Sequence, residues 1–202
     1  MHACDTLLVL DKPAGLLAVP GRGEAGRDNL ASRVQGRFAD ALVVHRLDQA
    51  TSGLMLFARG LAMQALLNKA FAQRAVHKNY VALVEGCVAA DQGQIDAPLA
   101  ADWPRRPRQQ VDHQHGKASL THWSVLARDD PPRTTRLLLK PITGRSHQLR
   151  VHLLHIGHPI RGDGLYAPEP LQAPRLMLHA TRLQLHHPVS DALLVFDSPV
   201  PF

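Results

Sequence analysis

The chain has 202 residues, of which 45% are hydrophobic and 20% charged, a composition that excludes disordered and collagen-like proteins. Lysine and arginine exceed aspartate and glutamate by 23 − 17 = 6, so a polyanionic partner such as nucleic acid is favoured. Two cysteines are too few for a disulfide framework, and no apolar run approaches the ~18 residues of a membrane span. We therefore expect a protein of the cytoplasm, with no contact to a membrane and no targeting segment.

Short β-type runs and three helical segments follow one another irregularly along the chain. The expected strands are residues 6–10, 42–45, 54–58, 80–84, 120–127, 136–140, 176–185 and 193–196. The expected helices are residues 28–38, 61–74 and 145–156, where apolar side chains recur three or four positions apart. Because several strands follow one another directly after residue 118, we predict an α+β fold. It should contain a mostly antiparallel mixed β-sheet flanked by helices and loops, in a single domain over residues 1–202.

Residues 97–117 form the least regular part of the chain, because prolines alternate there with arginines and no periodicity survives. We interpret this segment as a long exposed loop. Loops of that length inside a compact domain are commonly functional, and cations suit a phosphate backbone. Arg105, Arg106 and Arg108 are therefore predicted to bind nucleic acid, and a solvated basic loop without a ligand is the alternative.

A polar turn follows the strand predicted over residues 42–45 and precedes the next strand. Asp48 lies in this turn, close to Arg46 and to the hydroxyls of Thr51 and Ser52. A carboxylate that nearby cations and N–H donors keep ionised can act as a nucleophile or a base. Aspartate and serine are also ordinary turn residues, so the turn by itself leaves both interpretations open.

Four blocks of sequence occur in the order found in the RluA-type RNA pseudouridine synthases, a family that the chain resembles. They are KPAG and PG at residues 12–15 and 20–21, HRLDQATSG at 45–53, KNYVALVEG at 78–86, and TGRSHQLRVH with GHPIRGD at 143–152 and 157–163. Each block is a weak signal alone, but four in order make coincidence improbable. The segment DWPRRP at 102–107 resembles members of dual specificity, which modify large-subunit ribosomal RNA and tRNA anticodon stem-loops.

The resemblance implies the pseudouridine synthase catalytic fold and an enzyme that isomerises uridine in structured RNA. It places the catalytic aspartate at Asp48, the active-site tyrosine at Tyr80 and an arginine paired with the aspartate at Arg150. The reaction breaks the C1′–N1 bond of uridine and forms a C1′–C5 bond, so a carboxylate is needed as nucleophile or as base. A guanidinium can keep that carboxylate ionised and oriented, and an aromatic ring can stack on the uracil.

Further RNA contacts are expected on both sides of this catalytic set. Flipping a base out of an RNA stack costs a few kcal/mol. The resemblance implies that Arg46 offsets this cost by filling the space that the base leaves. The alternative is that Arg46 holds Asp48 or an RNA phosphate in place. His45, Arg145 and His147 are further predicted RNA contacts. Residues 143–146 are expected to open a helix whose N-terminus can bind a phosphate.

We expect no metal, no cofactor and a monomer. A zinc site is the alternative, because four histidines, at positions 147, 152, 155 and 158, lie close together, but no Cys, Asp or Glu in that helix completes a ligand set. The sequence has neither a P-loop nor a dinucleotide fingerprint. The small N-terminal S4-like RNA-binding domain of many RluA-type enzymes is expected to be absent, because the KPAG block begins at Lys12.

Two other functions remain open at this stage. A catalytically silent RNA-binding module would fit the positive charge alone. A glycosidase would need a second acid, for which Glu85 and Asp163 are the candidates at turn-like positions. The sequence also leaves open whether ribosomal RNA, tRNA or both are modified, and whether Asp48 acts covalently or as a base that generates a glycal.

Overall fold

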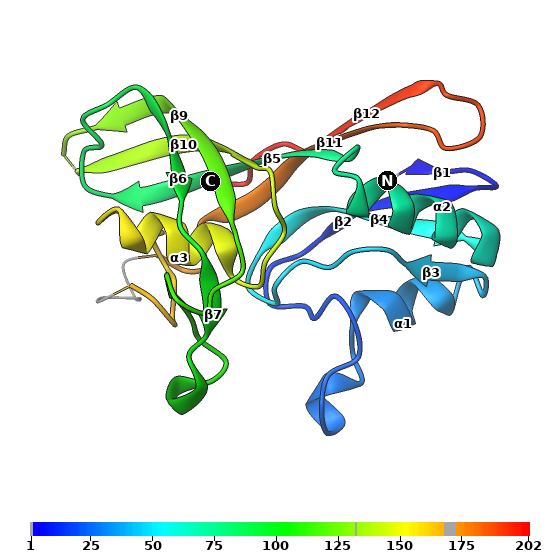
Figure 1. Cartoon of the computed structure of the whole chain (residues 1–202). Coiled ribbons are helices and arrows are strands. Elements are labelled where there is room, and N and C mark those ends of the chain that lie inside the picture. Colours follow the sequence, from blue (N-terminus) through cyan, green and yellow to red (C-terminus); the bar gives the residue numbers. More distant parts are fainter. Residues whose placement is uncertain (1, 132, 168–172) are drawn as a thin grey trace. The chain divides into compact units, whose positions relative to one another are not determined.

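A computed structural model describes residues 2–131, 133–167 and 173–202 (Figure 1). The chain forms two compact units. The first unit runs as far as Lys78 and includes Ala180–Pro201, and the second contains Asn79–His179 with Phe202. The chain passes from one unit to the other within two strands, β5 (His77–Glu85) and β11 (Leu178–His186).

The first unit is an antiparallel sheet with two α-helices. Its strands are β1 (His2–Ala3), β2 (Leu7–Lys12), β3 (Ala41–Val43), β4 (Ser52–Arg59), the larger part of β11, and β12 (Leu193–Asp197). Its helices are the 3₁₀ turn η1 (Glu24–Gly26), α1 (Leu30–Gln35) and α2 (Gly60–Ala72). Strand β4 lies between β2 and β11 and also pairs with β3, and β12 pairs with β11.

Strand β4 is central because its side chains are apolar on both faces. Successive side chains of a strand point to opposite faces, so its residues divide between two cores. Leu56 packs in one cluster with Leu67 of α2, and Met55 and Phe57 pack in another with Leu30 of α1. The two helices therefore cover opposite faces of the strand that immediately follows the Asp48 turn.

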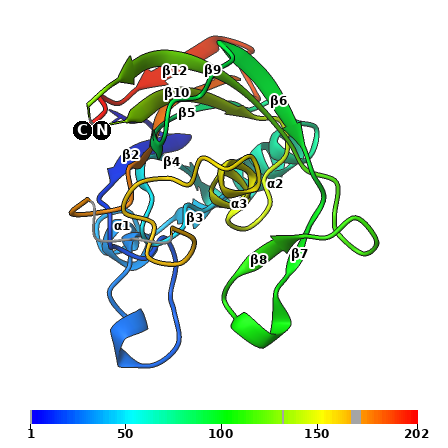
Figure 2. The same ribbon diagram turned by 90° about the vertical axis from the view of Figure 1, so that its left-hand side faces the viewer.

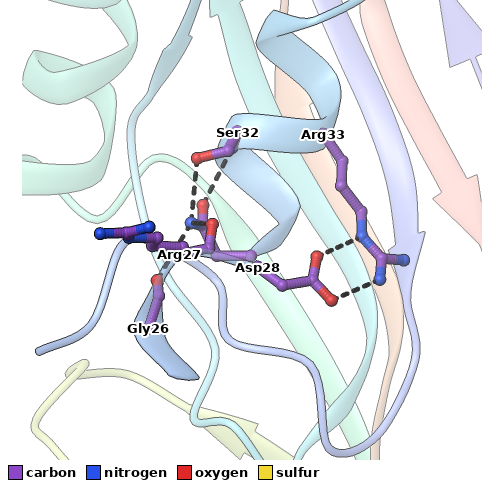
Figure 3. Close-up of polar contacts among 6 residues, drawn as sticks. Gly26, Arg27, Asp28, Ser32 and Arg33 are labelled. Carbon is purple, nitrogen blue, oxygen red and sulfur yellow. Dashed lines mark hydrogen bonds and ion pairs between the residues drawn. The ribbon is translucent and has the colours of Figure 1, made fainter. Parts of the chain in front are cut away.

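Helix α1 begins at residue 30, two residues later than predicted, because Asn29 is its N-cap. The Asn29 side chain accepts a hydrogen bond from the Ser32 N–H at 2.9 Å and donates to the Ser32 hydroxyl and to the Arg27 carbonyl, each at 2.9 Å. Figure 3 shows this cap beside the bidentate pair of Asp28 and Arg33. An asparagine at this position satisfies N–H groups that the first turn leaves without partners.

In its described residues the second unit has a sheet of four antiparallel strands, one hairpin and one α-helix. The strands are ordered β5, β10 (Thr134–Pro141), β9 (Leu120–Asp129) and β6 (Gln92–Asp96). The hairpin consists of β7 (Leu99–Ala101), the 3₁₀ turn η2 (Trp103–Arg105) and β8 (Gln109–Val111), and the helix is α3 (Gln148–His155). Figure 2 shows the hairpin extending from the rest of this unit, with η2 at its tip.

The predicted α+β class with a mostly antiparallel sheet is confirmed, and every expected strand and helix is present in part. The interpretation of residues 97–117 as a loop was wrong, because a β-hairpin lies within them. Its ladder pairs Leu99 with Val111, and its turn is organised by Asp102, which is buried. The prolines and arginines that hide the strand pattern lie mostly in and next to the turn.

Two other differences have local causes. Strand β6 was missed because it is largely polar, with Ile95 as its one fully buried side chain. Helix α3 begins at Gln148 and not at residue 145, because His147 adopts a left-handed backbone conformation with φ of 54°. None of the helices in the described ranges is long and apolar enough to cross a membrane.

Candidate active site

The buried side chain of Lys12 links the KPAG segment by hydrogen bonds to the turn that carries Asp48. The Lys12 side chain is fully buried, and its ammonium donates to the carbonyls of Pro13, Leu16 and Gln49 at 2.9, 2.7 and 3.0 Å. These acceptors match the three donors of an ammonium group. The Gln49 carbonyl also accepts the Gly15 N–H at 2.9 Å. In the sequence, Lys12 stands out only as the first residue of the KPAG block. Its contact with the turn that carries Asp48 was not predicted.

We expect Lys12→Met to lower the free energy of unfolding by about 3 kcal/mol, because buried carbonyls would lose their charged donor. Urea denaturation of the purified variant measures this change. Lys69→Met is the matched control, since Lys69 is exposed on α2 and its replacement should leave stability nearly unchanged. Equal stability of the two variants would contradict the assigned role of Lys12.

Asp48 itself is half-buried and lies in a tight turn. Its carbonyl accepts the N–H of Thr51 at 3.1 Å, and Leu47 beside it is buried. Arg46 precedes it with an exposed side chain, as a residue that enters an RNA helix requires. At Gly53 a β-carbon would lie 2.3 Å from the Ala180 carbonyl oxygen, and φ there is +112°. Only glycine therefore allows β4 to approach β11 directly after the turn.

His45 is held inside the first unit. Its Nε2 accepts the Leu56 N–H at 2.8 Å, and its ring stacks on Phe71 with centroids 4.8 Å apart. Burial lowers the pKa of His45 to about 3, with a further contribution from the Lys78 ammonium. The neutral His45 ring supports β4 through its bond to Leu56. At physiological pH it could contact RNA only as an uncharged group.

The lowered pKa of His45 predicts that the protein loses stability in mild acid. Below its ordinary value of 6.5 the unfolded chain binds a proton that the folded state does not, so stability falls as pH drops from 6.5 towards 3. At pH 5 we expect a loss of about 2 kcal/mol relative to pH 7.5. Urea denaturation at both values, with wild type and His45→Gln, measures the effect. If the variant loses as much stability as wild type, His45 does not cause the loss.

Arg150 forms a buried ion pair in the second unit. Its Nε and Nη2 donate to the two carboxylate oxygens of Asp163 at 2.8 and 2.6 Å, and both side chains are almost completely buried. Asp163 also accepts the N–H groups of Leu165 and Tyr166. A guanidinium carries five N–H donors, and this pair uses two of them in a bidentate geometry. Sequence reasoning had assigned Asp163 only a turn-like position.

The other polar residues of the TGRSHQLRVH block hold α3 against β9. The Gln148 side chain accepts from the Thr143 hydroxyl at 2.8 Å and from the Arg145 N–H at 3.0 Å, and it donates to Thr121 at 3.0 Å. His152 bonds the same Thr121 hydroxyl through Nδ1 and the Ala97 carbonyl through Nε2. This network fixes the helix that carries Arg150. Gln148 accepts the Arg145 N–H, and the helix begins at Gln148, so residues 143–146 precede the helix and do not open it. The phosphate contact predicted at these residues stays a prediction.

Tyr166 joins this helix to the arginine-rich hairpin. Its hydroxyl lies 2.6 Å from His147 Nδ1 and accepts the Gln109 N–H at 2.8 Å. The guanidinium carbons of Arg108 and Arg150 lie 5.2 and 5.0 Å from the centroid of its ring. The single ring is thus a cation–π partner for an arginine of the hairpin and for the arginine of the helix.

The remaining predicted residues lie as follows. Tyr80 is half-buried on β5, opposite Leu139 of β10. Arg105 and Arg145 are exposed; the first pairs with Asp102 at 2.7 Å, and the second donates from Nε to the Ala118 carbonyl. Asp48 and Arg46 therefore belong to the first unit, whereas Tyr80 and Arg150 belong to the second. The convergence of Asp48, Tyr80 and Arg150 on one uridine stays a prediction.

Within the described ranges no group of three or more histidine, cysteine or acidic side chains is arranged to hold a metal ion. His147 at the N-cap of α3 and His152 within it, two of the four clustered histidines, bond Tyr166, Thr121 and Ala97, as described above. His158 bonds the Glu85 carbonyl through Nδ1 at 2.9 Å. These three histidines hold the fold together, which explains their clustering in the sequence.

Residues 6–155 match a family model described as RNA pseudouridylate synthase. The chain belongs to this family. The dual-specificity RNA pseudouridine synthase RluA of Yersinia pestis is 50% identical over 97% of the chain and 96% of the relative, and that of Escherichia coli strain K12 is 46% identical over 100% and 93%. The human RNA pseudouridylate synthase domain containing 1 aligns with a TM-score of 0.82 and 29% identity, over 100% of the chain and 82% of the structure. Isomerisation of uridine to pseudouridine in RNA is the activity of the family and of this member.

Proposed function

We propose that the chain modifies uridines in both large-subunit ribosomal RNA and tRNA anticodon stem-loops. The observation that carries this is full-length identity of about half to relatives named as dual-specificity enzymes. The DWPRRP segment forms the tip of an exposed basic hairpin, which supports a contact with folded RNA outside the reacting nucleotide. The enzyme is proposed to act in the cytoplasm as a monomer and to fold as a single domain.

The proposed chemistry needs one carboxylate, one guanidinium and one aromatic ring. Asp48 either attacks C1′ to form an ester or removes a sugar proton to give a glycal, and uracil is freed from C1′ in both cases. The base then turns and its C5 bonds C1′; in the covalent route this breaks the ester and releases the Asp48 carboxylate, and in the glycal route Asp48 returns its proton to the sugar. The C5 proton is then lost. Arg150 keeps the Asp48 carboxylate ionised and oriented while its fork is anchored on Asp163. Tyr80 stacks on the uracil, and its hydroxyl helps to move the C5 proton.

The target uridine must leave its stack before the sugar can be reached. Arg46 is exposed next to Asp48, and we assign it to the space that the base vacates. Arg105, Arg106, Arg108 and Arg145 are assigned to RNA phosphates, with His147 and the uncharged His45 as further contacts. Most of these charges lie on or near the hairpin and the start of α3.

Tritium release from RNA labelled at uracil C5 tests the proposal. Wild-type protein is expected to release tritium from both a large-subunit ribosomal RNA fragment and a tRNA transcript, and nucleoside chromatography should then show pseudouridine in each. Release from only one RNA would contradict dual specificity. Release from neither would contradict activity on these substrates, and free uracil would indicate a glycosidase.

A glycosidase would need a second acid besides Asp48, and the environments of its two candidates disfavour that role. Glu85 pairs with Arg161 at 3.1 Å, and Asp163 pairs with Arg150. A general acid must carry a proton when it acts on the leaving group, whereas each of these carboxylates is engaged by an arginine. The second acid of a glycosidase is therefore not supported at either position.

A further inference from the structure

Trp103 is the large side chain that the fold of the second unit least explains. Its side chain is 68% exposed at the tip of the β7–β8 hairpin, although tryptophan has a large apolar surface. The other tryptophan of the chain, Trp123, lies half-buried on β9 against Gly93. Because Trp103 adds little to the core, its indole is a candidate for contact with a partner.

The turn that carries Trp103 is rigid before any ligand arrives. The Asp102 N–H donates to the Arg108 carbonyl at 2.9 Å, and the Arg105 N–H donates to the Asp102 carbonyl at 3.0 Å. The Asp102 carboxylate is buried and pairs with Arg105. A turn held in this way loses little backbone freedom when it binds, which favours affinity.

A guanidinium already lies on the indole. The Arg106 guanidinium carbon is 3.3 Å from the centroid of the Trp103 ring, so the two planar groups form a stack. Arg105 is exposed beside them. Proteins that bind unpaired nucleotides combine an aromatic face for the base with cations for the neighbouring phosphates.

We propose that Trp103, backed by Arg106, is a stacking platform for an unpaired base of the RNA substrate other than the target uridine. The proposal rests on the RNA-modifying function and adds a recognition residue to it. Tyr166 fixes the platform relative to Arg150 within the second unit, because it bonds the Gln109 N–H where β8 leaves the turn and lies beside Arg150. A base stacked on Trp103 would therefore orient the RNA with respect to the helix that carries Arg150.

Equilibrium binding of two labelled RNAs tests the platform. One is a stem-loop with an unpaired loop, and the other is a blunt duplex of the same stem. Trp103→Ala should weaken stem-loop binding about tenfold, the effect typical of losing one base–aromatic stack, and leave duplex binding unchanged. Trp103→Phe retains a ring and should bind within about threefold of wild type. Leu61→Ala, which also removes an exposed apolar side chain, should bind as wild type does.

Fluorescence gives a second, direct measurement. In a Trp123→Phe background Trp103 is the single tryptophan, and addition of the stem-loop should quench its emission. Unchanged stem-loop affinity of Trp103→Ala, equal weakening of both RNAs, or absence of quenching would each overturn the proposal. Tritium release by wild type separates the two levels: release from wild type together with unchanged stem-loop affinity of Trp103→Ala would overturn the platform alone, whereas failure of the proposed function would remove release from wild type itself.

Discussion

Asp48→Asn is expected to abolish tritium release, with a loss of at least ~10⁴-fold, because an amide can neither attack C1′ nor accept a sugar proton. The substitution keeps the size of the side chain. The turn around it is held by main-chain hydrogen bonds and by Lys12, so the fold should survive. The measurement is single-turnover tritium release at saturating RNA.

RNA affinity provides the control for this variant. Asp48→Asn should bind RNA within a few-fold of wild type, since the loss of one negative charge cannot weaken attraction to a polyanion. Retained tritium release by Asp48→Asn would remove Asp48 from the catalytic role. A catalytically silent RNA-binding module would give the same RNA binding and no release from either protein.

Asp163→Asn should lower both stability and activity, because it leaves the buried Arg150 guanidinium without its paired charge. Breaking a buried ion pair from one side costs about 3–5 kcal/mol. Activity should fall as well, since the fork of Arg150 would lose the partner that sets its orientation. Urea denaturation measures the first effect, and tritium release under conditions where the variant is folded measures the second.

The matched control is Asp197→Asn. Asp197 forms a bidentate pair with Arg182, as Asp163 does with Arg150, but on the surface of the first unit. Water screens exposed pairs, so stability and activity should change little. If Asp163→Asn behaved like Asp197→Asn, burial of the Arg150 pair would have no energetic consequence. A drop in stability with unchanged activity would make Asp163 a purely structural residue.

The sequence predicted those parts of the fold that local patterns determine. Apolar residues on both faces of β4 and the helical spacing in α2 were sufficient to find these elements. The β7–β8 hairpin could not be found in this way, because its strands have three residues each and depend on partners far along the chain. One such partner is Tyr166, whose hydroxyl accepts from Gln109.

In the candidate site, too, local sequence patterns identify some residues, whereas others are recognised only from contacts between distant segments. The ordered motifs singled out Asp48, Tyr80 and Arg150, but not what supports them. Asp163 pairs with Arg150 because the loop after α3 folds back onto the helix, and residue spacing does not predict this contact. A lysine reads as a surface residue by default, so the complete burial of Lys12 was equally unforeseen. Supporting residues of this kind are found from contacts and not from periodicity.

The environment of Lys12 has a consequence for chemical labelling. An amine reacts with an acylating reagent through its lone pair, which this ammonium can offer only after losing a proton that it now donates to a carbonyl. Amine-directed reagents should therefore modify the exposed Lys69, Lys117 and Lys140 quickly and Lys12 only when the segment opens. The rate of Lys12 acylation, followed by peptide mass spectrometry, thus measures how often the turn that carries Asp48 opens.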